Sequence, residues 1–93
     1  MTVSIKRLVI DSLIPRETTI VDLSRALGNS KGVDEVDINV TEVDSRTETT
    51  KLTIRGSDID YEGVIRVMKE HGATIRSVDE ISVAKSKALP GKT

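Results

Sequence analysis

The sequence predicts an α+β fold, a βαββαβ sandwich in which a four-stranded antiparallel sheet carries both helices on one face. The first observation is a near repeat, because residues 33–36 (VDEV) return as residues 78–81 (VDEI). The second is that each copy follows a helix-like segment that ends near a glycine, Gly28 or Gly72. Right-handed crossovers and a central hairpin join two such strand–helix–strand units into one sheet.

Residues 3–14 form the first predicted strand, and Pro15 ends it. The apolar side chains fall on both odd and even positions, as in a central strand buried on both faces. A helix follows, with Thr18 or Thr19 as its cap. Its apolar positions recur at helical spacing: Ile20, Leu23 and Leu27. Gly28 lies where a helix end favours a positive φ angle.

A β-hairpin is predicted between the two helices. From residue 33 the hydrophobic period changes to two, which is typical of a half-buried strand. The alternating apolar positions of the two strands are Val36, Ile38, Val40, Leu52 and Ile54. Polar residues 44–47 supply the turn, and Gly56 with Ser57 closes the hairpin.

The second helix is predicted to begin after Asp58 or Asp60. With Asp60 as the cap, Ile59 and Val64 occupy the two positions of a hydrophobic staple. The apolar stripe of this helix consists of Tyr61, Val64, Ile65 and Met68. Residues 74–84 form the last strand.

The composition predicts one domain, residues 1–85, and a flexible basic C-terminal tail, residues 86–93. The 93 residues are 37% hydrophobic and 31% charged, with a formal net charge of −1. This balance is typical of a globular protein and gives no electrostatic reason to expect binding to nucleic acid or to an acidic membrane. No apolar run is long enough to span a bilayer, so a cytoplasmic location is the simplest interpretation.

Several activities known for this topology need residue types that are missing. Cysteine, phenylalanine and tryptophan are absent, and Tyr61 is the only aromatic residue. A cysteine pair for a soft metal and strand aromatics that stack on RNA bases are therefore excluded. Residues 12–18, before the first helix, contain no glycine for a phosphate cradle. His71 has no partner serine and carboxylate in a recognisable order, so no nucleophilic catalysis is predicted.

The absence of large aromatic side chains also bears on assembly. An aliphatic core buries less area per residue, and small domains with a thin core are often stabilised by oligomerisation, so we expect a homo-oligomer. In the predicted topology one face of the sheet is uncovered. Strand alternation places on it a mixed, partly apolar set that would suit a subunit contact: Arg7, Val9, Asp11, Lys51 and Arg55.

Four carboxylates are predicted to meet at one border of the sheet. They are Asp11 near the end of the first strand, Glu42 and Asp44 at the end of the second, and Glu48 at the start of the third. Oxygen ligands without histidine or cysteine suit a hard cation, calcium or magnesium, rather than zinc. The alternative, favoured because surface carboxylates are common, is a solvated acidic rim balanced by Arg46 and Lys51.

Two other acidic groups have ordinary interpretations. Asp58 and Asp60 are explained as helix caps, although with Glu62 they have a spacing faintly like that of a calcium loop. Asp79 and Glu80 are expected in mid-strand at an edge of the sheet, where charges discourage unwanted pairing.

Four segments stand out by their order and spacing: residues 7–11 (RLVID), 42–48 (EVDSRTE), 53–60 (TIRGSDID) and 72–80 (GATIRSVDE). With them the chain, from about Lys6 to Lys85, resembles the small archaeal proteins of the family called domain of unknown function 211. The resemblance implies a ferredoxin-like fold, an archaeal cytosolic origin and a multimeric state, with no established activity. It also carries a loose association with calcium.

Three functions are compatible with these observations. The first is a non-enzymatic homo-oligomeric module that binds a divalent cation or another small ligand in a regulatory role. The second is a structural interaction domain that docks a partner on the open face of the sheet. The third and least favoured is a metal-dependent or acid–base enzyme that uses Asp11 and Asp44.

Overall fold

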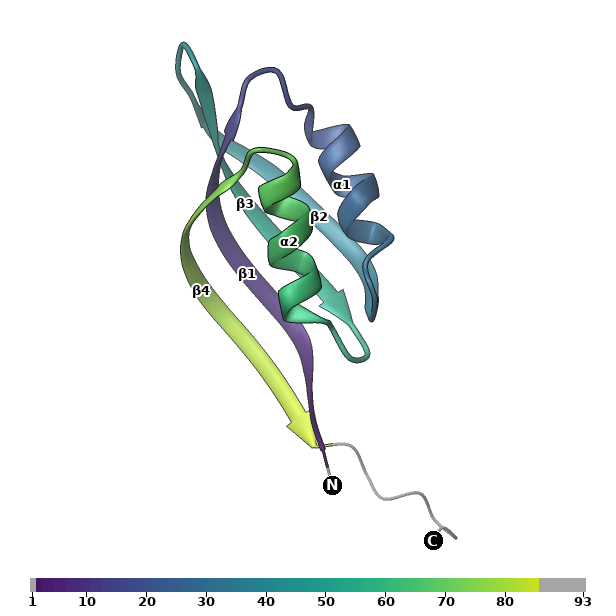
Figure 1. Cartoon of the computed structure of the whole chain (residues 1–93). Helices are drawn as coiled ribbons and strands as arrows, with labels where there is room; N and C mark the ends of the chain where they lie inside the picture. Colours follow the sequence, from purple (N-terminus) through teal and green to yellow (C-terminus); the bar gives the residue numbers. More distant parts are fainter. Residues whose placement is uncertain (1, 86–93) are drawn as a thin grey trace, which may run out of the picture.

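The chain is seen in a computed structural model that describes residues 2–85. The predicted tail, residues 86–93, lies outside the described residues. The elements in chain order are β1 (Val3–Pro15), α1 (Ile20–Gly28), β2 (Val33–Val43), β3 (Thr47–Gly56), α2 (Tyr61–Glu70) and β4 (Thr74–Lys85) (Figure 1). This order confirms the predicted βαββαβ arrangement.

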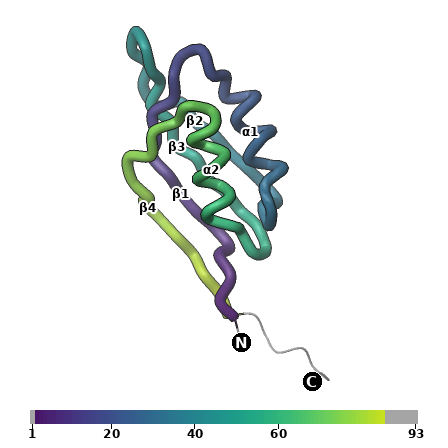
Figure 2. Tube along the Cα trace, viewed as in Figure 1, coloured from purple at the N-terminus to yellow at the C-terminus, as the bar shows by residue number. Residues whose placement is uncertain are grey.

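The four strands form one sheet in the order β2-β3-β1-β4, and every neighbouring pair is antiparallel. Strands β1 and β3 are therefore central, whereas β2 and β4 are edges. Both helices lie on the same face of the sheet (Figures 1 and 2). The predicted ferredoxin-like α+β fold class is confirmed. Within residues 2–85, neither helix has the length and hydrophobicity needed to cross a bilayer.

The core lies between the sheet and the two helices. The register pairs Leu8 with Ile54 and Ile10 with Leu52, so these side chains point to one face, and all four are fully buried. The helices close this layer with four buried residues: Leu23 and Leu27 from α1, and Val64 and Met68 from α2. From Leu8 to Ile14 the even-numbered positions of β1 thus build the helix-bearing face, and before the extra residue Lys6 it is Ile5 that packs against the core.

The predicted open face of the sheet is confirmed by the same register. Arg7 stands opposite Arg55 and Asp11 opposite Lys51, on the side away from the helices. Val9 belongs to this side too, yet it is only 1% exposed. The open face therefore offers little apolar surface, because its one aliphatic side chain at the centre is already covered.

Two predicted helix starts are resolved by their hydrogen bonds. Thr19, not Thr18, caps α1, since its hydroxyl oxygen accepts from the amide of Asp22 at 3.1 Å. Asp60 is the N-cap residue of α2, but its side chain makes no capping hydrogen bond. The hydrophobic staple is confirmed, because Ile59 is 4% exposed and Val64 is fully buried.

The positive φ angle predicted at Gly28 was wrong, whereas the helix-end glycine at Gly72 is confirmed, with φ of 79°. Helix α1 ends through Asn29 in a right-handed conformation, with the Asn29 amide donating to the carbonyl of Arg25 at 3.1 Å. The chain reverses later, at Gly32, where φ is 81°. The position of this glycine is determined by the close approach of another loop, and not by the end of the helix.

Strand β4 departs from strict alternation. Its register with β1 shifts three times: Asp79 and Arg76 are each an extra residue in β4, and Lys6 is an extra residue in β1, as in β-bulges. As a result, three apolar residues that are three apart in sequence point to the helix-bearing face: Ile75, Val78 and Ile81. Val83, two residues after Ile81, points there too. Ile81, for example, stands opposite the buried Leu8.

Candidate functional site

The four carboxylates predicted to bind a cation do not form one group within a single chain. Asp11 lies on the open face, and its Oδ2 atom is 3.9 Å from Nε of Arg76. Glu48 pairs with the buried Ile14, which places it on the helix-bearing face, because cross-strand partners share a face. Asp11 and Glu48 are therefore on opposite sides of the sheet.

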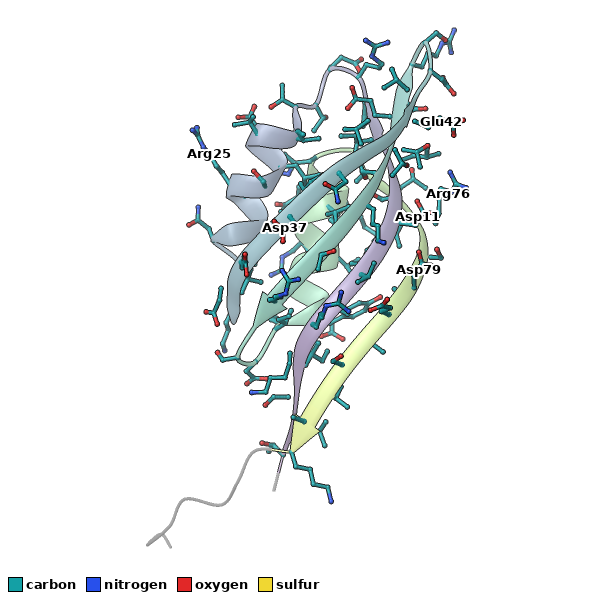
Figure 3. The ribbon with its side chains drawn as sticks, turned by 180° about the vertical axis from the view of Figure 1, so that it is seen from behind. Asp11, Arg25, Asp37, Glu42, Arg76 and Asp79 are labelled. Carbon is teal, nitrogen blue, oxygen red and sulfur yellow. The ribbon has the colours of Figure 1, made fainter. Side chains whose placement is uncertain are left out.

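The other two predicted ligands lie at the hairpin. Glu42 pairs with Thr49 after a register shift in β2, and Figure 3 shows it on the same side of the sheet as Asp11. Asp44 is in the turn, where its amide donates to the carbonyl of Thr47 at 2.9 Å. Across residues 2–85, no three aspartate, glutamate or histidine side chains are close enough to hold a metal ion. Cation binding by these residues stays a prediction.

Several charges on the open face are paired with one another inside the chain. Arg7 bridges from β1 to Glu80 on β4, and Arg55 on β3 bonds Asp37 on β2 at 2.9 Å. These side chains are partly exposed, so each pair contributes little to stability. Their effect is to cover the open face with neutralised polar groups, which makes it a poor apolar docking surface.

The remaining residues singled out by sequence have local roles. The His71 Nδ1 atom lies 2.9 Å from the carbonyl oxygen of Val67, one turn earlier. Asp79 accepts from the hydroxyl of Ser77 at 2.7 Å and lies at the outer edge of β4, as predicted for an edge-strand charge (Figure 3). Both side chains thus make a contact within their own element.

A row of exposed apolar side chains lies on the helix-bearing side of β4. Val78, Ile81 and Val83, here called the β4 apolar row, are 39%, 55% and 56% exposed. Their β1 neighbours on the same face are buried because the helices lie over the central strands. Strand β4 runs beside α2 at the sheet edge, and its last residues extend beyond that helix (Figure 1). The β4 apolar row therefore points to the same side of the sheet as the core, but no helix covers it.

An open groove of about 670 Å³ separates the β4 apolar row from the start of α2. Its apolar wall is formed by Ile5, Ile59, Tyr61, Val78 and Ile81. Its rim is charged and mostly acidic: Lys31, Asp58, Asp60 and Glu62. The carboxylates interpreted as helix caps thus border an apolar surface instead of making capping bonds.

Sequence reasoning missed the β4 apolar row. A strict period of two would place Val78 on the opposite face from Ile81 and Val83, and only the bulge at Asp79 brings the three to one side. The available signal was the spacing of three between Val78 and Ile81. Such spacing in a strand indicates an extra residue.

These features define a small α+β domain of ferredoxin-like topology, with a polar open face and an uncovered apolar edge. The profile of the family described as uncharacterised ArCR, domain of unknown function 211, matches residues 6–88. The uncharacterised protein MJ0319 of Methanocaldococcus jannaschii is 37% identical over 81 residues, which are 87% of this chain and 84% of that protein. The chain belongs to the domain of unknown function 211 family of small archaeal proteins.

Proposed function

We propose that this protein is a non-enzymatic module that works as a homo-oligomer, with copies meeting at the surface beside β4. The observation that carries the proposal is the β4 apolar row, whose three side chains are 39–56% exposed on an edge strand. Contiguous exposed apolar side chains on a small domain favour a protein contact. An unpaired strand edge next to them adds backbone donors and acceptors that a partner can satisfy.

The test is substitution of Ile81 by lysine, which places a charge in the middle of the β4 apolar row. We expect the variant to sediment as a monomer at concentrations where the wild-type chain is associated, because an unpaired charge is costly to bury. Ile81 is 55% exposed, so the folded chain should tolerate the change. Analytical ultracentrifugation over a concentration series measures the effect.

Val21→Lys is the matched control, since Val21 is 54% exposed but lies on α1, away from β4. It should associate like the wild type. A wild-type chain that is monomeric at every concentration contradicts the proposal. Association of Ile81→Lys equal to that of Val21→Lys would place the contact elsewhere on the molecule.

We propose a divalent cation, calcium in particular, as a further ligand of this module, with a regulatory role. Asp11 and Glu42 share the open face, and within residues 2–85 no third carboxylate joins them. A cation held by these side chains would complete its coordination shell with water. Because a ligand that binds only the folded chain stabilises it, calcium at 100 times its Kd adds about 2.7 kcal/mol.

Thermal melting with millimolar calcium or with a chelator tests this ligand. We expect calcium to raise the Tm of the wild type and of the monomeric Ile81→Lys variant alike, because Asp11 and Glu42 lie on the face opposite to Ile81. Glu42→Gln should weaken the response in the wild-type background. Equal melting curves for the wild type with and without calcium would remove the cation from the proposal, and a rise confined to the wild type would indicate a site that exists only in the assembly.

A further inference from the structure

We propose that two copies pair β4 with β4 in an antiparallel manner, about a two-fold axis that passes through Ser82. The inference rests on the proposed self-association and adds its partner surface, direction and register. The occupant of the β4 edge is thus a second copy of this chain. The paired strands would join two sheets into one of eight strands.

The last part of β4 is suited to this pairing. The two extra residues of β4 are Arg76 and Asp79, so residues 80–85 contain none, and the shift opposite Ser82 and Val83 comes from Lys6 of β1. Among residues 2–85, no strand pairs with the outer edge of this segment. The segment also extends past α2, so the helix does not stand in front of an incoming strand (Figure 1). Antiparallel pairing would satisfy its backbone groups.

Symmetry restricts the possible registers. A two-fold axis that makes neighbouring edge strands antiparallel is normal to the sheet, so the helices of both copies lie on one side. Cross-strand partners must also point to the same face. Residues facing each other must then be separated by an even number in sequence, and the axis passes through a residue.

Most positions of the axis would place a charged side chain opposite an aliphatic one or opposite a like charge. An axis at Glu80 places two glutamates opposite each other, which is unfavourable. An axis at Ile81 sets Val83 against the charged Asp79 of the second copy. An axis at Val83 sets Ile81 against Lys85 of the second copy. Each of these registers puts a charge against an aliphatic side chain or against a like charge.

The axis at Ser82 avoids all of these conflicts. It places Ile81 of each copy opposite Val83 of the other, so four aliphatic side chains form one cluster on the helix-bearing side. It also brings Asp79 of each copy next to Lys85 of the other, in two symmetric pairs of opposite charge. Apolar and charged groups are therefore complementary in this one register, which is what an isologous interface requires.

Cysteine cross-linking tests this geometry directly, because the chain contains no cysteine. In an antiparallel pair, directly opposed Cα atoms are roughly 4.5–5.5 Å apart, within the range that a disulfide spans. Ser82→Cys should therefore oxidise to a covalent dimer of doubled mass. Ser77→Cys is the control, since it is exposed on the same strand but is far from its symmetry mate. It should stay largely uncross-linked.

A charge exchange gives a second readout that does not depend on oxidation. Asp79→Lys should weaken association in sedimentation, because Lys85 of the second copy then meets a like charge. The double variant with Asp79→Lys and Lys85→Asp should recover association, since the opposite charges are restored. Recovery is not expected if the two positions lie far apart in the assembly.

The outcomes separate this inference from the proposed function. Rapid cross-linking of Ser82→Cys, with little for Ser77→Cys, supports the register. An associated wild-type chain in which Ser82→Cys does not cross-link, or cross-links no faster than Ser77→Cys, overturns the register but leaves self-association intact. In that case the β4 apolar row meets another surface of the second copy. A wild-type chain that never associates overturns both.

Discussion

Replacing Gly32 by alanine is expected to destabilise the fold by more than about 2 kcal/mol, beyond the usual cost of a left-handed residue. Its φ angle of 81° is one that side chains disfavour. A Cβ atom there would lie 1.8 Å from the carbonyl oxygen of Asp58 and 3.0 Å from Cα of Ile59. Both contacts are with backbone, which cannot move aside as a flexible side chain can.

The reason for this close approach is a seam between two loops. The amide of Ser57 donates to the carbonyl of Gly32 at 3.2 Å, and the amide of Asp60 donates to that of Lys31 at 3.1 Å. These bonds tie the loop after α1 to the loop before α2. Because Lys31 and Asp60 also border the groove beside β4, the seam holds one wall of that groove in place.

Urea unfolding of the Gly32→Ala variant measures the loss, and Gly28→Ala is the matched control. A Cβ atom at Gly28 meets nothing within 4 Å, and the residue is helical. Alanine there should raise the free energy of unfolding by about 0.5–1 kcal/mol. Equal stabilities of the two variants would show that the seam is not as tight as the distances indicate.

The elements of this fold were predictable because each depends on local pattern. Apolar side chains on both parities of residues 3–14 identified β1 as central, and three successive residues of it, Leu8, Val9 and Ile10, are buried. The hairpin followed from the change of period at Val33 and the polar turn at 44–47. These patterns reflect which side of an element meets the core, and the sequence records that directly.

Features set by contacts between distant segments were not predictable in the same way. The glycine with positive φ is Gly32 instead of Gly28, because the crowding at Asp58 comes from another loop. Likewise, Glu48 and Asp11 were expected at one border of the sheet. They lie near the hairpin end but on opposite faces, since the face depends on cross-strand register as well as on position along a strand.

The dependence on distant contacts also explains why the candidate contact surface lies at β4 and not on the open face of the sheet. The open face was expected to be the contact surface because no helix covers it, but its central aliphatic residue Val9 is buried and several of its charges are paired within the chain. The uncovered apolar side chains are on the opposite side, at β4, where two helices are too few to span four strands. Bulges at Arg76 and Asp79 determine which residues point there, and bulges leave only a weak trace in sequence.

Truncation of Leu52 to alanine is expected to remove about 3–4 kcal/mol from the free energy of unfolding, as for other fully buried leucines. Leu52 is 0% exposed on the central strand β3, between Ile10 on β1 and Ile38 on β2. The surrounding side chains are branched aliphatics held on a sheet, so they close only part of the cavity. For a domain of this size that loss is a large fraction of total stability.

Denaturant unfolding of Leu52→Ala measures the loss, with Val43→Ala as control. Val43 is 54% exposed at the hairpin, so its truncation should change stability by less than about 0.5 kcal/mol. A small loss at Leu52 would mean that the sheet collapses into the cavity.

The weakly stable Leu52→Ala variant also allows the effect of assembly on stability to be measured. If only the folded chain pairs through β4, raising its concentration raises the Tm by mass action. Adding Ile81→Lys in the same chain should abolish that concentration dependence while leaving the Tm at low concentration nearly unchanged. A concentration dependence that survives Ile81→Lys would show that the folded state is stabilised through a different surface.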